Sequence, residues 1–197
     1  MIRKIYIKLC FLWRKIKWKK YQNKYGFGSW HMIPKASKPY TKDIVKYIVK
    51  NKGETDCIVE FGCGLCDILA NRGLKKWKRT GVEKEESVYQ ACRAIYKNTN
   101  IKFIHGSFMD IGNEKIDWFI AVNFIHNIPK EEIKKILYQL AKKNNVQYFI
   151  LDEVSGNYPY THNFDFLVRG GYCLVQSLGP YKADQGERYI RIYRIKK

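Results

Sequence analysis

Short apolar segments alternate with helix-like segments through most of this 197-residue chain, and this alternation restricts its fold more than any other feature. The apolar segments have the length and the β-branched or aromatic content of strands; they span residues 57–61, 80–83, 101–105, 116–122 and 146–151. The helix-like segments span residues 41–51, 67–72, 86–97 and 129–143. Parallel strands require crossover connections, and the helices between these strands supply them. The pattern predicts an α/β fold, with a mostly parallel sheet covered by helices on both faces and a terminal hairpin from residues 172–176 and 189–195.

A glycine-rich stretch, VEFGCGLCDIL, occupies residues 59–69 and includes the turn after the first predicted strand. Glycines at such a turn let the backbone come close to a ligand, and the start of a helix there offers free N–H groups. In a parallel sheet this turn lies at the edge where ligands bind. The dinucleotide-binding pattern needs a third glycine where Asp67 stands, and the lysine of a phosphate-binding loop is absent. A pyrophosphate is therefore not the expected ligand.

Four motifs between about residue 41 and residue 195 resemble those of the class I S-adenosylmethionine-dependent methyltransferases. The first, residues 60–66, is an acid followed by a glycine-rich turn, with Cys66 in place of the family's last glycine. The second is the acid in TGVEKE, residues 80–85. The third is HGSFMDI, residues 105–111, in which the family often has an acid at the position of Ser107. The fourth is the strand and following helix IDWFIAVNFIHNIPKEEIKKIL, residues 116–137. The resemblance implies a Rossmann-like methyltransferase fold with a seven-stranded sheet, and S-adenosylmethionine as the cofactor.

The resemblance also implies roles for particular residues. Glu60 would hold the amino group of the cofactor directly or through water, and Glu83 would accept hydrogen bonds from both ribose hydroxyls. Ser107 and Phe108 would contact the adenine. The implied cofactor-binding residues are Glu60, Gly62, Cys63, Gly64, Glu83, Lys84, Ser107, Phe108, Asp110 and Asn123.

Cys63 and Cys66 form a Cys-x-x-Cys pair inside the glycine-rich turn. A zinc site would need two further ligands, and the sequence contains no second pair at a matching spacing. A cysteine near a helix start has a lowered pKa, which leaves a redox role open for Cys66. Small side chains that fill the turn are the simpler interpretation, so we expect no metal.

Methyl transfer to a hydroxyl needs a base that takes its proton. His126, just past the fourth predicted strand, is one candidate, although a structural role suits it equally well. His31, beside Trp30 in an aromatic loop, is a second candidate if that loop covers the site as a lid. Other residues that could border the cofactor or the acceptor are Lys38, Pro39, Tyr40, Asp152, Glu153 and His162.

The positive charge of the chain is concentrated at its N-terminus. Residues 1–52 contain 15 basic and one acidic side chain (15 − 1 = +14), whereas residues 53–197 contain 22 and 17 (22 − 17 = +5). On a helical wheel of residues 2–20 one face is apolar, formed by Ile2, Ile5, Tyr6, Leu9, Leu12, Trp13 and Ile16. Most of the rest is basic, but Ile7, Phe11 and Trp18 interrupt it. Such a helix could pack its apolar face on the domain, lie on an anionic membrane surface or, less favoured, contact nucleic acid.

Two regions follow from these patterns: residues 1–40, with a basic amphipathic helix and an aromatic lid or linker, and residues 41–197, with the cofactor-binding domain. Six scattered cysteines and no secretory signal suggest reduced thiols in a cytoplasmic protein, peripheral at the membrane if the helix binds there. The leading functional hypothesis is O-methylation of a glycan or of a lipid-linked or small-molecule acceptor, with a place in surface-polysaccharide biosynthesis. RNA methylation and a non-catalytic accessory role are the alternatives, and the sequence does not indicate an oligomeric state.

Overall fold

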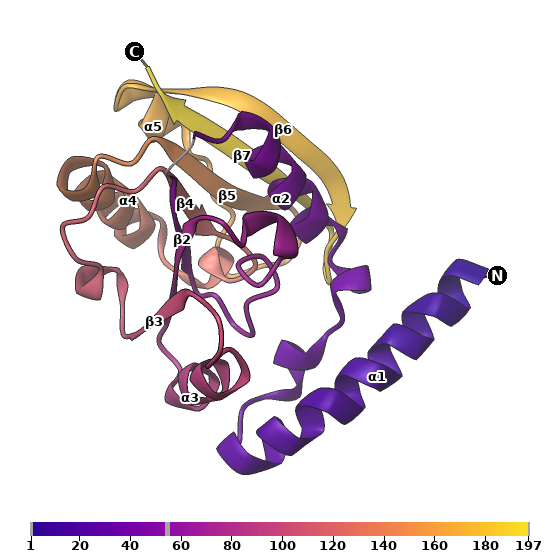
Figure 1. Cartoon of the computed structure of the whole chain (residues 1–197). Coiled ribbons are helices and arrows are strands. Elements are labelled where there is room, and N and C mark those ends of the chain that lie inside the picture. Colours follow the sequence, from indigo (N-terminus) through magenta and orange to yellow (C-terminus); the bar gives the residue numbers. More distant parts are fainter. Residues whose placement is uncertain (1, 54–55, 197) are drawn as a thin grey trace.

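The computed structural model describes residues 2–53 and 56–196, which form a seven-stranded sheet with helices around it (Figure 1). The strands lie in the order β3-β2-β1-β4-β5-β7-β6. Neighbouring strands from β3 to β5 are parallel, and β7 is antiparallel to both β5 and β6. The strand bounds are β1 Cys57–Phe61, β2 Lys78–Glu83, β3 Ile101–His105, β4 Trp118–Ala121, β5 Tyr148–Val154, β6 Tyr172–Lys182 and β7 Glu187–Ile195. The predicted fold, a mostly parallel sheet that ends in an antiparallel hairpin, is confirmed.

The order of the strands reverses at β1. The chain runs outward from β1 through β2 to β3, then crosses back to place β4 on the other side of β1. All four residues of β4 are buried, as expected for a central strand covered on both faces. A crevice therefore opens at the carboxyl ends of β1 and β4, the position where sheets of this type bind ligands.

Two apolar cores cover the two faces of the sheet. The first packs α2 (Pro39–Asn51) and α3 (Glu86–Ile95) on one face, through residues such as Ile44, Ile48 and Val88. The second packs α4 (Lys130–Asn144) and the short α5 (Asp165–Arg169) on the other, through residues such as Ile136 and Phe166. The spacing of the apolar residues predicts all of these helices except α5, whose five residues are too few to show a period.

The helix predicted at residues 67–72 is wrong. Residues 64–70 form consecutive turns instead, and a 3₁₀ helix, η3, follows at Arg72–Leu74. Cys66, directly before the predicted helix, has a left-handed backbone (φ 56°), so a regular helical turn cannot include it. In addition, the N–H of Leu69 donates to the Glu60 carboxylate at 3.3 Å, which removes it from helical hydrogen bonding.

The hairpin of β6 and β7 closes one side of the sheet. Its first strand, β6, is longer than predicted. Among the described strands β6 pairs only with β7, so its other side is an edge of the sheet. The register shifts between Leu174 and Gln176 and again between Leu178 and Tyr181. These irregularities are β-bulges, which bend and twist the edge.

The N-terminal helix α1 (Ile2–Tyr25) presents different residues to the domain and to solvent. Trp18 is buried in the first core, and Tyr21 and Tyr25 pack against it. Leu9 is 60% exposed, and it lies nine residues from Trp18, about two and a half helical turns, so the two side chains point to opposite sides. Leu12, Trp13 and Ile16 are exposed on the same side as Leu9.

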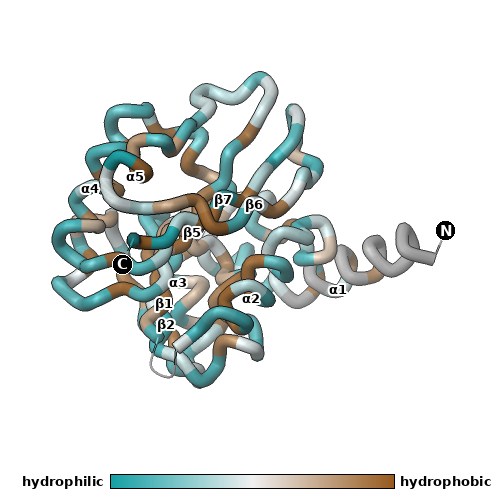
Figure 2. Tube along the Cα trace, turned by 90° about the horizontal axis from the view of Figure 1, so that it is seen from above, coloured by the Kyte–Doolittle hydropathy of each residue, from teal (hydrophilic) through white to brown (hydrophobic). Residues whose placement is uncertain are grey.

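The apolar face expected for this helix therefore does not pack on the domain where its side chains are described. The hypothesis that it does so is wrong for Leu9, Leu12 and Ile16, while Trp18, which interrupts the basic face, makes the contact. Ile2, Ile5 and Tyr6, the other members of the predicted face, have side chains outside the described part of the chain. In Figure 1 the N-terminal part of α1 extends away from the sheet. Figure 2 shows hydrophobic residues, in brown, at the neighbouring strands β5 and β7. None of the described helices combines the length and the apolarity needed to cross a membrane.

Two 3₁₀ helices, η1 (Ser29–Met32) and η2 (Lys35–Ser37), lie in the segment that connects α1 to α2. The sequence predicts this segment as an irregular loop. Phe27 and Met32 are nevertheless buried in the first core. The segment is therefore packed onto the domain rather than extended into solvent.

Candidate functional site

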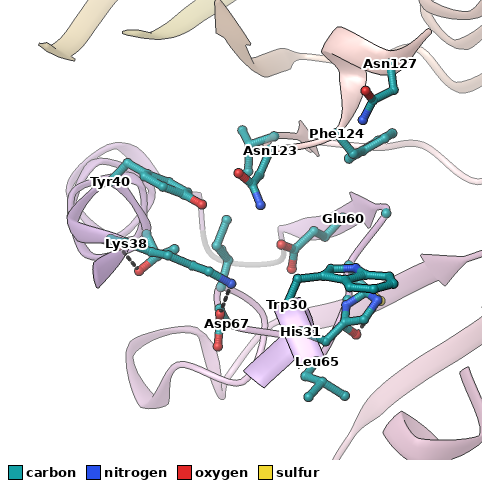
Figure 3. A pocket seen from close by; sticks show the side chains of 16 residues that line it. Trp30, His31, Lys38, Tyr40, Glu60, Leu65, Asp67, Asn123, Phe124 and Asn127 are labelled. Atoms are coloured by element: carbon teal, nitrogen blue, oxygen red, sulfur yellow. Dashed lines mark hydrogen bonds and ion pairs between the residues drawn. The ribbon is translucent and has the colours of Figure 1, made fainter. Parts of the chain in front are cut away.

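A cavity of about 250 Å³ lies at the carboxyl ends of β1 and β4 (Figure 3). The glycine loop after β1 and the turn after β4 form two of its walls, and the aromatic segment before α2 forms a third. Its lining residues are Trp30, His31, Lys38, Tyr40, Thr41, Glu60, Gly62, Cys63, Gly64, Leu65, Asp67, Ile68, Val122, Asn123, Phe124 and Asn127. Among the residues predicted for the site, the structure thus brings together Glu60, Gly62, Cys63, Gly64, Asn123 and His31.

The glycine loop needs its two glycines for geometric reasons. Gly62 and Gly64 have left-handed backbones, with φ of 64° and 51°. A Cβ on Gly62 would lie 2.5 Å from the ring of Phe124, so even an alanine would clash there. The N–H groups of Gly62 and Cys63 both donate to the carbonyl of Val82 on β2. The loop is therefore fixed to the sheet, and its backbone at Gly62 and Gly64 lines the cavity.

Glu60 is the principal buried acid of the cavity. Glu60 is 5% exposed, and its carboxyl group faces the cavity in Figure 3. Burial raises the pKa of this carboxyl group from 4.5 to about 8, against the opposing effect of the hydrogen bond from Leu69. A cationic group in the cavity would favour the charged carboxylate and lower that pKa again. The site is thus suited to a ligand that carries an ammonium or other positive group.

Glu83, at the end of β2, is expected from the sequence to bind the ribose hydroxyls of the cofactor, but its carboxylate contacts the backbone of this chain instead. It is buried but does not line the cavity. Its Oε2 accepts a hydrogen bond from the N–H of Gly64 at 2.9 Å, and its Oε1 accepts one from the N–H of Glu85 at 3.0 Å. Burial raises the pKa of this carboxyl group as well. Glu83 therefore braces the glycine loop, and its predicted contact with ribose would use the remaining lone pairs.

The residues predicted to contact adenine lie outside the cavity. Ser107 and Asp110 cap the 3₁₀ helix η4 (Phe108–Asp110), and the Ser107 N–H donates to Asp110 Oδ2 at 2.7 Å. Phe108 borders a second, apolar cavity of about 430 Å³ next to α4. Lys84 contributes its carbonyl oxygen, 3.1 Å from His105 Nε2. The structure places these residues at the ends of β2 and β3 without joining them to the cavity.

The aromatic segment before α2 covers the cavity and is fixed at two points. His31 Nε2 lies 3.3 Å from Glu85 Oε2, and Lys38 Nζ lies 2.9 Å from Asp67 Oδ2. Trp30 lies beside His31, with ring centroids 5.4 Å apart and ring planes tilted by 38°, and it is 63% exposed. In Figure 3 the rings of Trp30 and His31 lie over the glycine loop. We refer to residues 26–38 as the lid.

His126, the other candidate base, does not line the cavity. Its ring packs against Tyr158, with centroids 4.7 Å apart, and its Nδ1 is buried without a hydrogen-bond partner among the described residues. Burial lowers the pKa of this imidazole, so it is neutral near pH 7. His162 is also directed elsewhere, with its Nε2 2.7 Å from the Ile125 carbonyl oxygen. The cavity receives Asn123 and Asn127 from this region instead.

A buried ion pair behind the cavity holds Asn123 in place. Asp152, at the end of β5, accepts a hydrogen bond from the Asn123 N–H at 2.9 Å and lies 3.0 Å from Arg188 Nε. Arg188 in turn lies over the ring of Tyr40, 5.1 Å from its centroid. Burial raises the pKa of Asp152 to about 6 despite the neighbouring guanidinium. Sequence reasoning missed Arg188, because no local motif links β7 to the turn after β4.

Asp152 and Glu153 are therefore not acceptor-side residues in this structure. Glu153 forms an ion pair with Arg191 at 2.5 Å, and neither acid lines the cavity. The lowered pKa expected for Cys66 is also wrong. No helix starts at Cys66, and burial raises the pKa of its thiol well above the usual value.

Comparison with known proteins finds likeness in structure only. No protein-family model and no curated protein matches the sequence. The magnesium protoporphyrin IX methyltransferase ChlM of Synechocystis PCC 6803, solved with bound S-adenosylmethionine, superposes with a TM-score of 0.67 and 16% identity, over 80% of this chain and 79% of that chain.

Two further solved structures agree. An S-adenosylmethionine-dependent methyltransferase from Clostridium acetobutylicum gives a TM-score of 0.62 at 12% identity, over 82% and 92% of the two chains. The glycopeptide N-methyltransferase MtfA, complexed with sinefungin, gives 0.59 at 11% identity, over 79% and 94%. The chain therefore has the fold of the class I S-adenosylmethionine-dependent methyltransferases.

Proposed function

We propose that the protein is an S-adenosylmethionine-dependent methyltransferase that methylates a hydroxyl group of a glycan, of a lipid-linked precursor or of another small acceptor. The observation that carries the proposal is the buried carboxyl group of Glu60, which faces the cavity beside the glycine loop that forms one of its walls. Solved proteins of the same fold were crystallised with S-adenosylmethionine or sinefungin, which supports this choice of cofactor.

The residues of the cavity fit such a cofactor. Glu60 would accept hydrogen bonds from its ammonium group, and the backbone at Gly62 and Gly64 would allow its close approach. Lys38 is paired with Asp67 at the other side of the cavity. Its ammonium group would attract the carboxylate of the cofactor. When bound, S-adenosylmethionine would supply a methyl group on a sulfonium cation.

His31 is the residue of this chain that we propose as the base. It lines the cavity, and the carboxylate of Glu85 lies 3.3 Å from its Nε2. That contact would orient the ring and stabilise the imidazolium that forms when His31 takes the proton of the acceptor hydroxyl. The aromatic rings of Trp30, Tyr40 and Phe124 in the same cavity support an acceptor with an apolar ring face, as sugars have.

The proposal is tested first by isothermal titration with S-adenosylmethionine and with S-adenosylhomocysteine. Binding of both, weakened strongly by Glu60→Ala, supports it. A folded protein that binds neither would favour a non-catalytic accessory role. Transfer of labelled methyl groups to extracted glycolipids rather than to RNA would then support the acceptor class, whereas the reverse would favour RNA methylation.

The role of His31 has its own readout. In His31→Ala the turnover should fall strongly while the affinity for S-adenosylmethionine changes little, and the pH profile should lose the limb that reports the base. His126→Ala is the matched control, because His126 does not line the cavity. Equal losses in both variants would refute this assignment.

We further propose that α1 binds the protein to an anionic membrane surface, where a lipid-linked acceptor would lie. The exposed residues Leu9, Leu12, Trp13 and Ile16 form one apolar side of the helix, and exposed lysines such as Lys15, Lys19 and Lys20 accompany them. An apolar stripe combined with cations suits a lipid surface, which can receive both; a nucleic-acid backbone can bind only the cations.

Liposome flotation tests this surface. We expect the protein to bind vesicles that contain anionic phospholipid and to bind neutral vesicles weakly, and Leu12→Asp/Ile16→Asp should abolish the binding. Leu174→Asp, a charge on an exposed apolar residue of β6, is the matched control. Salt-sensitive RNA binding without liposome binding would overturn the proposal.

A further inference from the structure

Three buried cysteines meet beneath the glycine loop. Cys63 and Cys66 belong to the loop itself, and Cys92 comes from α3. Their sulfur atoms all lie within 4.8 Å of one another. Sequence spacing shows only the first two as a pair, because Cys92 is brought to them by the crossover from β2 to β3.

The surrounding backbone accommodates these sulfurs at some conformational cost. Cys66 keeps a side chain at a φ of 56°, where glycine is favoured. A Cβ on Gly81 of β2 would lie 2.8 Å from Cys63 Sγ, so the glycine there leaves the space that this sulfur occupies. Cys92 Sγ donates to the carbonyl of Gly64 at 2.8 Å. A different feature thus positions each of the three sulfurs in the cluster: the backbone of Cys66, the space beside Gly81 and the hydrogen bond from Cys92.

This geometry is close to that of a three-sulfur metal site. In tetrahedral zinc sites the Zn–S bond is about 2.3 Å, which puts neighbouring sulfurs about 3.8 Å apart. Side-chain rotations that change each sulfur-to-sulfur distance by roughly 1 Å or less would bring the three sulfurs to that spacing. Three buried thiolates carry three negative charges, which a divalent ion offsets better than a monovalent one.

We propose that Cys63, Cys66 and Cys92 form a binding site for Zn²⁺, with its fourth position open to the cavity. Cys63 lines the cavity, and this gives the ion a route of entry and leaves space for a water ligand. Binding would displace one proton from each thiol that is protonated in the metal-free protein. It would also tie the glycine loop to α3. The site does not depend on the proposed methyl transfer.

Metal binding is measured directly on the reduced, full-length protein. We expect about one Zn²⁺ per chain in competition with a chromophoric chelator, and an ultraviolet sulfur-to-metal band on titration with Cd²⁺. Because each cysteine binds the ion as a thiolate, the affinity should increase with pH.

The test variant is Cys66→Gly, because glycine suits the left-handed backbone and should preserve the fold. Its affinity for Zn²⁺ should fall roughly tenfold or more, and Cys92→Ala should show the same loss. Cys173→Ser, on β6 and outside the cluster, is the control. The proposal is overturned if the folded wild-type protein takes up no stoichiometric Zn²⁺, or if Cys66→Gly binds it equally well.

Discussion

Replacement of Glu60 by glutamine should stabilise the protein at neutral and alkaline pH while it weakens binding of the cofactor. Glutamine keeps an oxygen that can accept the hydrogen bond from the Leu69 N–H, and it removes only the charge. Burial raises the pKa of Glu60 from 4.5 to about 8. The folded protein therefore holds this proton more tightly than the unfolded chain does.

The sign and size of the effect follow from this shift. Because the folded-state pKa is the higher one, Glu60 lowers the free energy of unfolding as the pH rises from about 4.5 to about 8. Each pH unit in this interval contributes about 1.4 kcal/mol, so the whole shift corresponds to about 5 kcal/mol. Wild type and Glu60→Gln should be equally stable at the acidic end, and the variant should gain progressively up to the alkaline end.

Urea denaturation of both proteins across this pH interval measures the difference, and the comparison cancels the titration of other acids. Glu83→Gln is a comparison for the hydrogen bonds rather than for the pH dependence, because burial raises the pKa of Glu83 as well. Both oxygens of Glu83 accept backbone hydrogen bonds, and glutamine has only one accepting oxygen, so this variant should lose about 1–3 kcal/mol. A difference between wild type and Glu60→Gln that does not change with pH would refute the reasoning.

Three further variants test other parts of the structure. Asp152→Asn leaves Arg188 buried without its anion and should cost about 3–5 kcal/mol in urea denaturation, whereas Asp152→Leu/Arg188→Met should recover most of it; no recovery would contradict a pairwise origin. Gly62→Ala combines a left-handed φ with a clash, and should reduce the melting temperature more than Gly171→Ala, which adds only the φ penalty. Trp18→Ala should cost about 3–5 kcal/mol and make α1 sensitive to protease; unchanged cleavage would show that other contacts hold the helix.

The sheet could be predicted because its signals are local. The runs that form β1 and β4 are mostly apolar over a strand's length, and the glycines after β1 show where the sheet can bind a ligand. The turns at residues 64–70 could not be predicted from periodicity, because their conformation depends on the left-handed backbone at Cys66 and on the hydrogen bond to Glu60.

The orientation of α1 was not predictable for a similar reason. A helical wheel finds the largest apolar face, and it cannot show which face meets the domain. The single Trp18, which interrupts the basic face, makes that contact together with Tyr21 and Tyr25. The identity of the packed face was decided by tertiary contacts rather than by amphipathicity.

The candidate site also contains residues that the sequence predicted and residues that only the structure reveals. Glu60, Gly62 and Gly64 follow directly from the motif after β1, and all three line the cavity. Arg188 and Cys92 reach their partners through chain crossovers, which no spacing rule reports. His126 has the expected place in the sequence, but its ring turns toward Tyr158.

The bulged edge strand β6 also affects how copies of this protein can meet. A second chain that tried to extend the sheet would need an even row of backbone donors and acceptors along this edge. The two register shifts interrupt that row, and Pro180 lacks an N–H altogether. The hairpin thus closes this edge of the sheet against strand addition, and a second chain that paired by strand addition would have to use the β3 edge at the other end of the sheet.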